Sequence, residues 1–262
     1  MQQFTGLSSS FVQESKHVTK TNKFQHVTPA MIANVAKQYG FDLVSLKTGN
    51  ARNADRAAHQ TTIARYRSTD QFQISGLYVD LIFKVPHLYG AIEGILGTYR
   101  QVCSNGLAVG VKFETIKVKH LGNPVEELFR EIPRLVAQRS QLAETIKRMQ
   151  GTYLNDDKKL QLAREIGAAR LASVGNVNWF DYAGLIKIER PEDSGDDLFS
   201  VFNRIQEQIV RTGLRYTFQT TDFKTGQPII KNATARRLTE NTSRSVSFNS
   251  IMWDHATSKI AA

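Results

Sequence analysis

Residues 111–119 read VKFETIKVK, and this stretch decides the fold class. Two sets of side chains alternate along it: Phe113, Thr115, Lys117 and Lys119 against Lys112, Glu114, Ile116 and Val118. A period of two is typical of a β-strand that has one solvent-exposed face and one buried face. We therefore expect a strand here, with Lys117 and Lys119 on one face and Lys112 on the other.

Four stretches before it are also rich in β-branched and aromatic residues, and we expect strands at about 41–46, 59–67, 71–85 and 99–103. Helical patterns flank this region. Thr28-Pro29 and Asn123-Pro124 each pair an N-cap residue with proline at the first helical position. Pro133 should kink or divide the helix that Asn123 begins.

Further helices are expected from about Asn155, from 196 to 211 and from 246 to 260, with a short strand at 215–220. Strands and helices do not alternate along the chain. The pattern therefore predicts an α+β fold with a mostly antiparallel twisted sheet (about residues 41–120) packed with C-terminal helices. We expect a single domain over residues 1–262: an irregular arm (1–27), a mainly β part (28–122) and a mainly α part (123–262).

Composition limits the class of protein. The chain has 262 residues, 41% of them apolar and 22% charged, which is typical of a globular protein. A single cysteine, Cys103, excludes an intrachain disulfide and favours a reducing compartment. We find no secretory signal at the start and no apolar run of about 20 residues. The sequence thus predicts a cytoplasmic protein without a membrane span.

The positive charge is concentrated toward both ends. The net charge is +10, and residues 16–67 contribute +7 and residues 211–262 contribute +5, so the remaining residues sum to −2. Such an excess can simply serve solubility. The sharper interpretation is a surface for a polyanion, most often a nucleic acid.

Motifs for catalysis are scarce. The sequence has no phosphate-binding P-loop, no nucleophile elbow and no zinc-protease helix motif. The six histidines are scattered singly, and the acids at 156–157 and 193–197 lie at expected helix starts, where they act as caps. We therefore expect no catalytic residue, no metal and no cofactor.

Cations interleaved with aromatic rings are more frequent in this sequence than catalytic motifs. A protein that binds single-stranded nucleic acid needs both, cations for the phosphates and rings for the bases. The candidate nucleic-acid-binding residues are Arg65, Tyr66, Arg67, Arg100, Lys112, Lys117, Lys119, Arg215, Tyr216, Lys224, Arg236, Arg237 and Arg244. The cations among them would hold phosphates, and Tyr66 and Tyr216 would stack on bases. Alternatively, these rings pack at the edge of the hydrophobic core and expose their hydroxyl groups to solvent.

Three segments resemble a family of domains of unknown function encoded by phages and plasmids. The signature R-x-V-C-S-N-G-L appears at 100–107, the D-L-x-x-x-F-N-R helix begins at Asp197, and the final N-x-x-L-W appears at 249–253 with Met252 in place of Leu. The similarity extends along most of the chain. Polar residues in these segments can also be structural: Asn203 and Arg204 could hydrogen-bond a neighbouring loop.

The resemblance implies a mobile-element context close to DNA metabolism. We expect a non-catalytic protein that binds single-stranded DNA and acts in phage transcription, replication or recombination. Within this interpretation it would recruit phage RNA polymerase to melted promoters. Two other classes remain open: a protein-interaction module that inhibits or redirects a host enzyme, and a metal-dependent nuclease. Strand annealing, a variant of the binding role, would predict ring oligomers.

Overall fold

The computed structural model describes residues 19–48, 59–69, 73–74, 77–101, 108–238 and 243–260. The chain divides into two compact units, where the sequence predicts one domain. The first comprises Met1–Arg100 and Lys112–Leu142, and the second comprises Gln101–Val111 and Ala143–Ala262.

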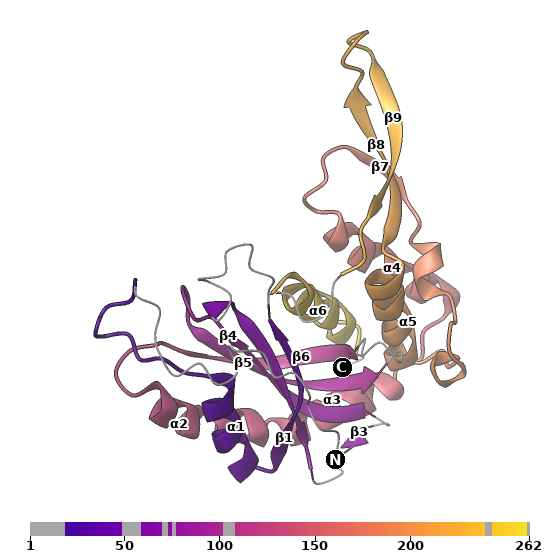
Figure 1. The fold of residues 1–262 in the computed structure, drawn as a ribbon. Coiled ribbons are helices and arrows are strands. Elements are labelled where there is room, and N and C mark those ends of the chain that lie inside the picture. Colours follow the sequence, from indigo (N-terminus) through magenta and orange to yellow (C-terminus); the bar gives the residue numbers. More distant parts are fainter. Residues whose placement is uncertain are drawn as a thin grey trace. The chain divides into compact units, whose positions relative to one another are not determined.

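An antiparallel sheet forms the body of the first unit (Figure 1). Its strand order is β1-β2-β4-β5-β6, and β3 pairs with β4 beside this path. The strands are β1 (Phe41–Thr48), β2 (Thr62–Ser68), β3 (Gln73–Ile74), β4 (Leu77–Val85), β5 (Ile92–Gln101) and β6 (Ala108–Val118). This architecture confirms the predicted α+β class and the antiparallel sheet.

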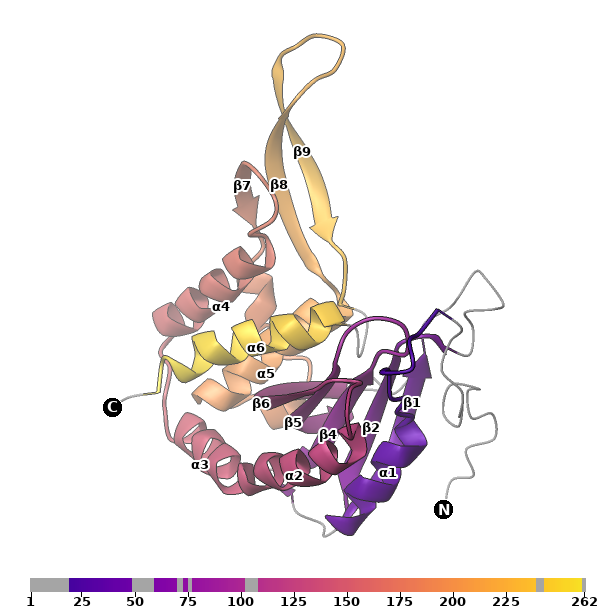
Figure 2. The same ribbon diagram turned by 90° about the vertical axis from the view of Figure 1, so that its left-hand side faces the viewer.

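Two helices lie along one face of this sheet, as Figures 1 and 2 show: α1 (Pro29–Gln38) and α2 (Pro124–Ala137). Both begin as the sequence predicts. The Thr28 side chain accepts a hydrogen bond from the Met31 backbone N–H, and the Asn123 side chain accepts one from Glu126. The core between helices and sheet is fully buried and apolar; its members include Ile32, Val35, Phe41, Leu81 and Phe83.

Pro133 lies inside α2, and the helical stretch that was expected to be kinked or divided by it is divided into α2 and α3 at Gln138. The helix continues to Ala137, and α3 (Arg139–Gln150) follows directly. A proline lacks the N–H that would bond the carbonyl four residues earlier, here that of Phe129. The Tyr39 hydroxyl donates to this carbonyl at 3.2 Å. A side chain from the end of α1 therefore supplies the hydrogen bond that the proline removes.

Helix α5 (Leu198–Arg211) is buried from Leu198 to Val210 in the second unit. It contacts α6 (Ser243–Thr257) and the 3-10 helices η3 (Ala183–Ile186) and η4 (Pro191–Asp193). Helix α4 (Asp156–Arg170) contacts α6 and η3 in turn. The expected cap residues Asn155 and Asp197 begin α4 and α5. The Trp253 ring of α6 meets that of Phe202 edge to face, with centroids 5.8 Å apart.

A second, three-stranded sheet has the order β7-β8-β9, with β7 (Val177–Phe180), β8 (Leu214–Thr221) and β9 (Pro228–Ala235). Gly213 has φ +79° where α5 turns into β8, and a Cβ there would collide with the Ala235 carbonyl oxygen. Only glycine fits this junction. Figures 1 and 2 show the β8–β9 hairpin projecting well beyond α4 and α5 of its own unit.

No helix in the described part of the chain is long and apolar enough to cross a membrane.

Candidate nucleic-acid interface

The predicted cations of β2 contact a buried carboxylate. Arg67 and Asp80 are directly opposed in the β2–β4 register, and Arg67 Nε lies 3.0 Å from Asp80 Oδ1. Arg65 Nε lies 3.4 Å from Asp80 Oδ2. The Asp80 side chain is fully buried, whereas those of Arg65 and Arg67 are 12% and 20% exposed. Burial raises the pKa of the Asp80 carboxyl, and Arg67 and Arg65 oppose that shift.

Tyr66 does not fit its predicted stacking role. Its side chain is fully buried, and its hydroxyl donates to the Pro29 carbonyl oxygen at 2.8 Å. Its ring meets that of Phe83 edge to face, with centroids 5.9 Å apart. Burial raises the pKa of this hydroxyl. The prediction that Tyr66 stacks on a base was wrong, because alternation along β2 directs this ring into the core beneath α1.

The lysines at the end of β6 lie as the sequence predicts. Lys117 and Lys119 are exposed, while Ile116 and Val118 between them are buried. Arg100 and Lys112 lie on β5 and β6, and Arg244 lies in α6. Their side chains fall outside the described part of the structure, as do residues 102–107 of the signature segment.

The remaining predicted cations gather on the β8–β9 hairpin and its flanks, residues 214–237, which we call the arm. Arg215 is 75% exposed and pairs with Asp181, its Nη2 lying 2.6 Å from Oδ2. Lys224 lies in the turn between the strands, and Arg236 and Arg237 follow β9, all three exposed. The arm carries five Lys or Arg residues and a single acid, Asp222.

Apolar side chains are also exposed on the arm. Phe223, in the turn, is 103% exposed and Ile230, on β9, is 66% exposed. The predicted stacking residue Tyr216 is half-buried, with its ring 5.8 Å from that of Phe218. Phe223 therefore offers a much more accessible ring than Tyr216.

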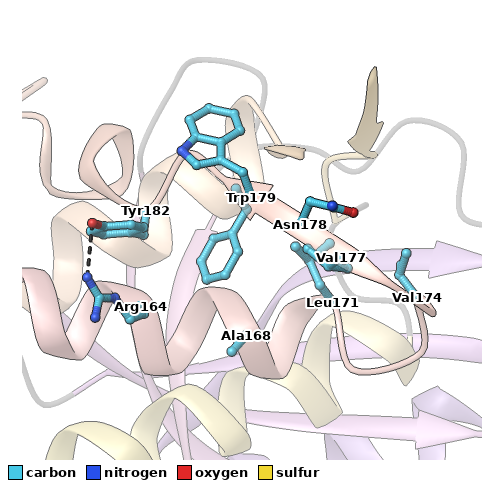
Figure 3. A pocket seen from close by; sticks show the side chains of 9 residues that line it. Arg164, Ala168, Leu171, Val174, Val177, Asn178, Trp179 and Tyr182 are labelled. Atoms are coloured by element: carbon cyan, nitrogen blue, oxygen red, sulfur yellow. Dashed lines mark hydrogen bonds between the residues drawn. The ribbon is translucent and has the colours of Figure 1, made fainter. Parts of the chain in front are cut away.

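A cavity of about 340 Å³ opens beside the arm, between α4 and β7 (Figure 3). Ala168, Leu171 and Val177 contribute its apolar wall, and Trp179 and Tyr182 contribute exposed or half-exposed rings. The cavity lies entirely within the second unit.

Sequence reasoning singled out neither Trp179 nor Phe223. Trp179 lies on a strand of only four residues, too short for a pattern of alternation to appear. The only available signals were the residues themselves: a tryptophan outside any apolar stripe, and a phenylalanine in the turn sequence D-F-K-T-G.

Four histidines that are scattered in the sequence gather at one end of the main sheet: His26, His59, His87 and His120. The rings of His26 and His87 have centroids 5.2 Å apart, and those of His26 and His59 lie 6.3 Å apart. Burial, reinforced by the neighbouring histidines, lowers the pKa of His87 to about 3. Among the described residues, no group of three or more His, Cys, Asp or Glu side chains is placed to hold a metal ion.

A model of the family described as "Domain of unknown function (DUF932)" matches residues 16–249. The chain belongs to the DUF932 family. Two Escherichia coli (strain K12) proteins, UPF0380 protein YafZ and UPF0380 protein YfjQ, are each 23% identical to it over 207 residues. These alignments cover 78% of this chain and 74% of each relative. No solved structure matches.

The DUF932 match includes the main sheet, the cavity and the arm. It also includes the polar pair of α5, whose structural role the sequence suggested. Asn203 Nδ2 donates to Asp193 Oδ1 at 3.3 Å, and Arg204 donates to the backbone carbonyls of Asp193 and Gly195. The expectation that this pair hydrogen-bonds a neighbouring loop is confirmed.

The other acids near the helix starts of this DUF932 chain have structural partners as well. Asp197 accepts a hydrogen bond from the Ser200 backbone N–H at 3.0 Å, as an N-cap does. Lys159 Nζ lies 3.0 Å from Asp156 Oδ1 and 2.7 Å from Asp196 Oδ1. The hydrogen bond from Lys159 lowers the pKa of Asp196. Asp156, Asp196 and Asp197 thus each have a structural partner in the fold.

Proposed function

We propose that this chain is a non-catalytic single-stranded DNA-binding protein of a phage or other mobile element. The observation that carries the proposal is the charge of the arm, which holds five cations against one acid on a projecting hairpin. A surface of this kind attracts the phosphates of a nucleic acid and releases the counterions that surround them.

The distribution of rings favours a single strand over a duplex. Unpaired bases expose π-faces that stack on aromatic side chains, whereas the bases of a duplex are already stacked on one another. The arm offers such a ring at Phe223, next to Lys224. Phosphate contacts would come from Arg215, Lys224, Lys231, Arg236 and Arg237, with Lys117 and Lys119 as exposed cations of the main sheet.

Arg215 can exchange its partner for a phosphate. Its ion pair with Asp181 involves a side chain that is 75% exposed, and exposed pairs stabilise a fold by only about 0–1 kcal/mol. The contacts of Arg65 and Arg67 are different, because their common partner Asp80 is fully buried. We therefore assign the main phosphate contacts to the arm and a structural role to the arginines of β2.

The biological setting comes from the resemblance of residues 100–107 to the phage and plasmid signature. In that setting the protein acts in the host cytoplasm in phage transcription, replication or recombination. Recruitment of phage RNA polymerase to melted promoters is the narrowest form of the proposal.

A charge-neutralising variant tests the role of the arm. Arg236→Gln combined with Arg237→Gln removes two exposed cations, and Lys147→Gln combined with Lys158→Gln removes two exposed cations from α3 and α4. Binding of a labelled oligothymidylate is measured by fluorescence anisotropy over a salt titration. We expect only the arm variant to flatten the slope of log K against log salt, by about 1.4, since each single-strand phosphate contact contributes roughly 0.7.

Equal slopes for the two double variants would contradict the assignment of phosphate contacts to the arm. An affinity of the unmodified protein that does not change with salt would contradict DNA binding itself.

A further inference from the structure

The cavity between α4 and β7 has an apolar wall and an aromatic, cationic rim. Ala168, Leu171 and Val177 line the wall. At the rim the Arg164 guanidinium lies 4.7 Å from the centroid of the Tyr182 ring, and Arg164 Nη2 donates to the Tyr182 hydroxyl at 3.0 Å. Figure 3 shows this pair on one side of the cavity and the Trp179 ring rising from β7 above it.

Trp179 is unusually accessible for a tryptophan. Its side chain is 51% exposed, whereas Trp253, the other tryptophan of the chain, is 5% exposed. The β7–β8 register is irregular between Val177 and Trp179, as in a β-bulge. A bulge redirects side chains and is common beside functional sites. The indole ring is exposed to solvent, and Trp179 is one of the residues that line the cavity.

The strand register connects this ring to the arm. Trp179 pairs with Thr217, and Thr217 pairs with Asn232 of β9. Paired residues of antiparallel strands share a face, as do residues two apart, so Trp179 lies on the same face as Arg215. Lys231, which pairs with Phe218, lies on the other face. A single strand that contacts Arg215 along the first face would pass over the Trp179 ring.

We propose that this cavity takes one nucleobase of the bound single strand, unstacked from its neighbours and held against the Trp179 ring. A volume of about 340 Å³ is at the lower end of the roughly 300–1,000 Å³ range of ligand pockets, which suits one ring system. Arg164 at the rim supplies positive charge for an adjacent phosphate. This inference rests on the proposed function and adds a base-binding subsite to it.

Two oligomers of equal length separate base contacts from phosphate contacts: an oligothymidylate and an abasic deoxyribose-phosphate strand. Because Trp179 is exposed and Trp253 is buried, a base that stacks on an indole ring can quench only the Trp179 part of the tryptophan emission. We expect the oligothymidylate to quench the emission and the abasic strand to leave it nearly unchanged. Stacking on an aromatic ring depends on the base and not on the backbone.

Three variants complete the experiment. Trp179→Ala should weaken oligothymidylate binding about 5- to 150-fold, the range expected for one stacked base, and leave abasic-strand binding unchanged. Trp179→Phe should retain most of the affinity because it keeps a ring. Tyr153→Ala removes a 69% exposed ring away from the cavity and should change neither affinity. Circular dichroism melts verify that each variant is folded.

The outcomes separate this inference from the proposed function. Tight, salt-dependent binding that Trp179→Ala does not alter, or equal affinity for the two oligomers, would overturn the base-binding subsite and leave DNA binding standing. No binding of either oligomer at low salt would overturn both.

Discussion

Arg67 donates two hydrogen bonds to Asp80, from Nε to Oδ1 at 3.0 Å and from Nη2 to Oδ2 at 3.2 Å, between directly opposed positions of β2 and β4. Arg67 also covers the Tyr78 ring, with its guanidinium carbon 4.0 Å from the ring centroid. A phosphate would have to compete with this buried carboxylate for the guanidinium. The arrangement gives Arg67 a structural role, and we therefore assign the proposed DNA contacts to more exposed cations.

Removal of Asp80 should destabilise the protein strongly. In Asp80→Ala the two arginines lose a common, fully buried partner and face each other as like charges. Lost hydrogen bonds to charged groups cost about 1.5–3 kcal/mol, and we expect a loss in this range in the free energy of unfolding measured with urea. Lys84→Ala, which removes the partly exposed pair with Glu93, should cost at most about 1 kcal/mol. Equal losses would contradict the structural role of Asp80.

The histidine cluster should make the first unit sensitive to acid. The pKa of His87 is near its ordinary 6.5 in the unfolded chain and about 3 in the fold, so the unfolded state binds the proton more readily. The stabilising effect of neutral His87 is complete above about pH 6.5 and is lost as the pH falls toward 3. His26, His59 and His120 surround this ring and add to its resistance to protonation.

His87→Gln should therefore lose less stability than the unmodified protein between pH 7 and pH 4, as followed by thermal melts at each pH. His255→Gln, at a half-exposed position on α6 outside the cluster, is the control. A parallel decline in all three proteins would show that His87 does not contribute to acid sensitivity.

Gly167 of α4 should not tolerate a side chain. A Cβ there would lie 2.5 Å from Phe180 Cε2, so Gly167→Ala must displace this ring from α4. Overpacking costs about 1–3 kcal/mol, and the better helix propensity of alanine returns roughly 0.5–1 kcal/mol. We expect a net loss of about 1 kcal/mol in urea unfolding. Gly175→Ala, with no atom within 4 Å of the added Cβ, should be nearly neutral.

Phe223 should contribute to binding and not to stability. Because the side chain is fully exposed, Phe223→Ala should change the free energy of unfolding by less than about 0.5 kcal/mol. If the ring stacks on a base, the same variant weakens oligothymidylate binding by about 1–3 kcal/mol. Tyr89→Ala removes a 78% exposed ring of the first unit and provides the matched control. Unchanged affinity in Phe223→Ala would exclude this ring from the interface.

Local patterns predicted much of the fold. The alternation around Lys117 and Lys119 and the caps at Thr28, Asn123 and Asn155 were confirmed, because each depends on neighbours within four residues. Strand β9 was not predicted, since it begins with a proline and its adjacent Ile229 and Ile230 break the alternation. The contact of Tyr39 with the Phe129 carbonyl could not be predicted, because the two residues are 90 positions apart in the sequence.

The candidate site was harder to predict than the fold. The sequence shows that Tyr66 stands between two arginines, but not that its ring points toward α1 while theirs meet Asp80. The distant Asp80 decides the role of Arg65 and Arg67, and no local pattern contains it. Arg215, Lys224, Arg236 and Arg237 were predicted as a basic region, but only the pairing of β8 with β9 places them on a projecting hairpin.

A comparison of three nucleic acids tests the central claim most directly. The unmodified protein is mixed with single-stranded DNA, duplex DNA and RNA of one length, and affinities are measured at about 50 and 200 mM salt. We predict the tightest binding to single-stranded DNA, weakened by about 100-fold between the two salts if all five cations of the arm contact phosphates. No binding to single-stranded DNA at the lower salt, or an affinity that does not change with salt, would contradict the proposed function.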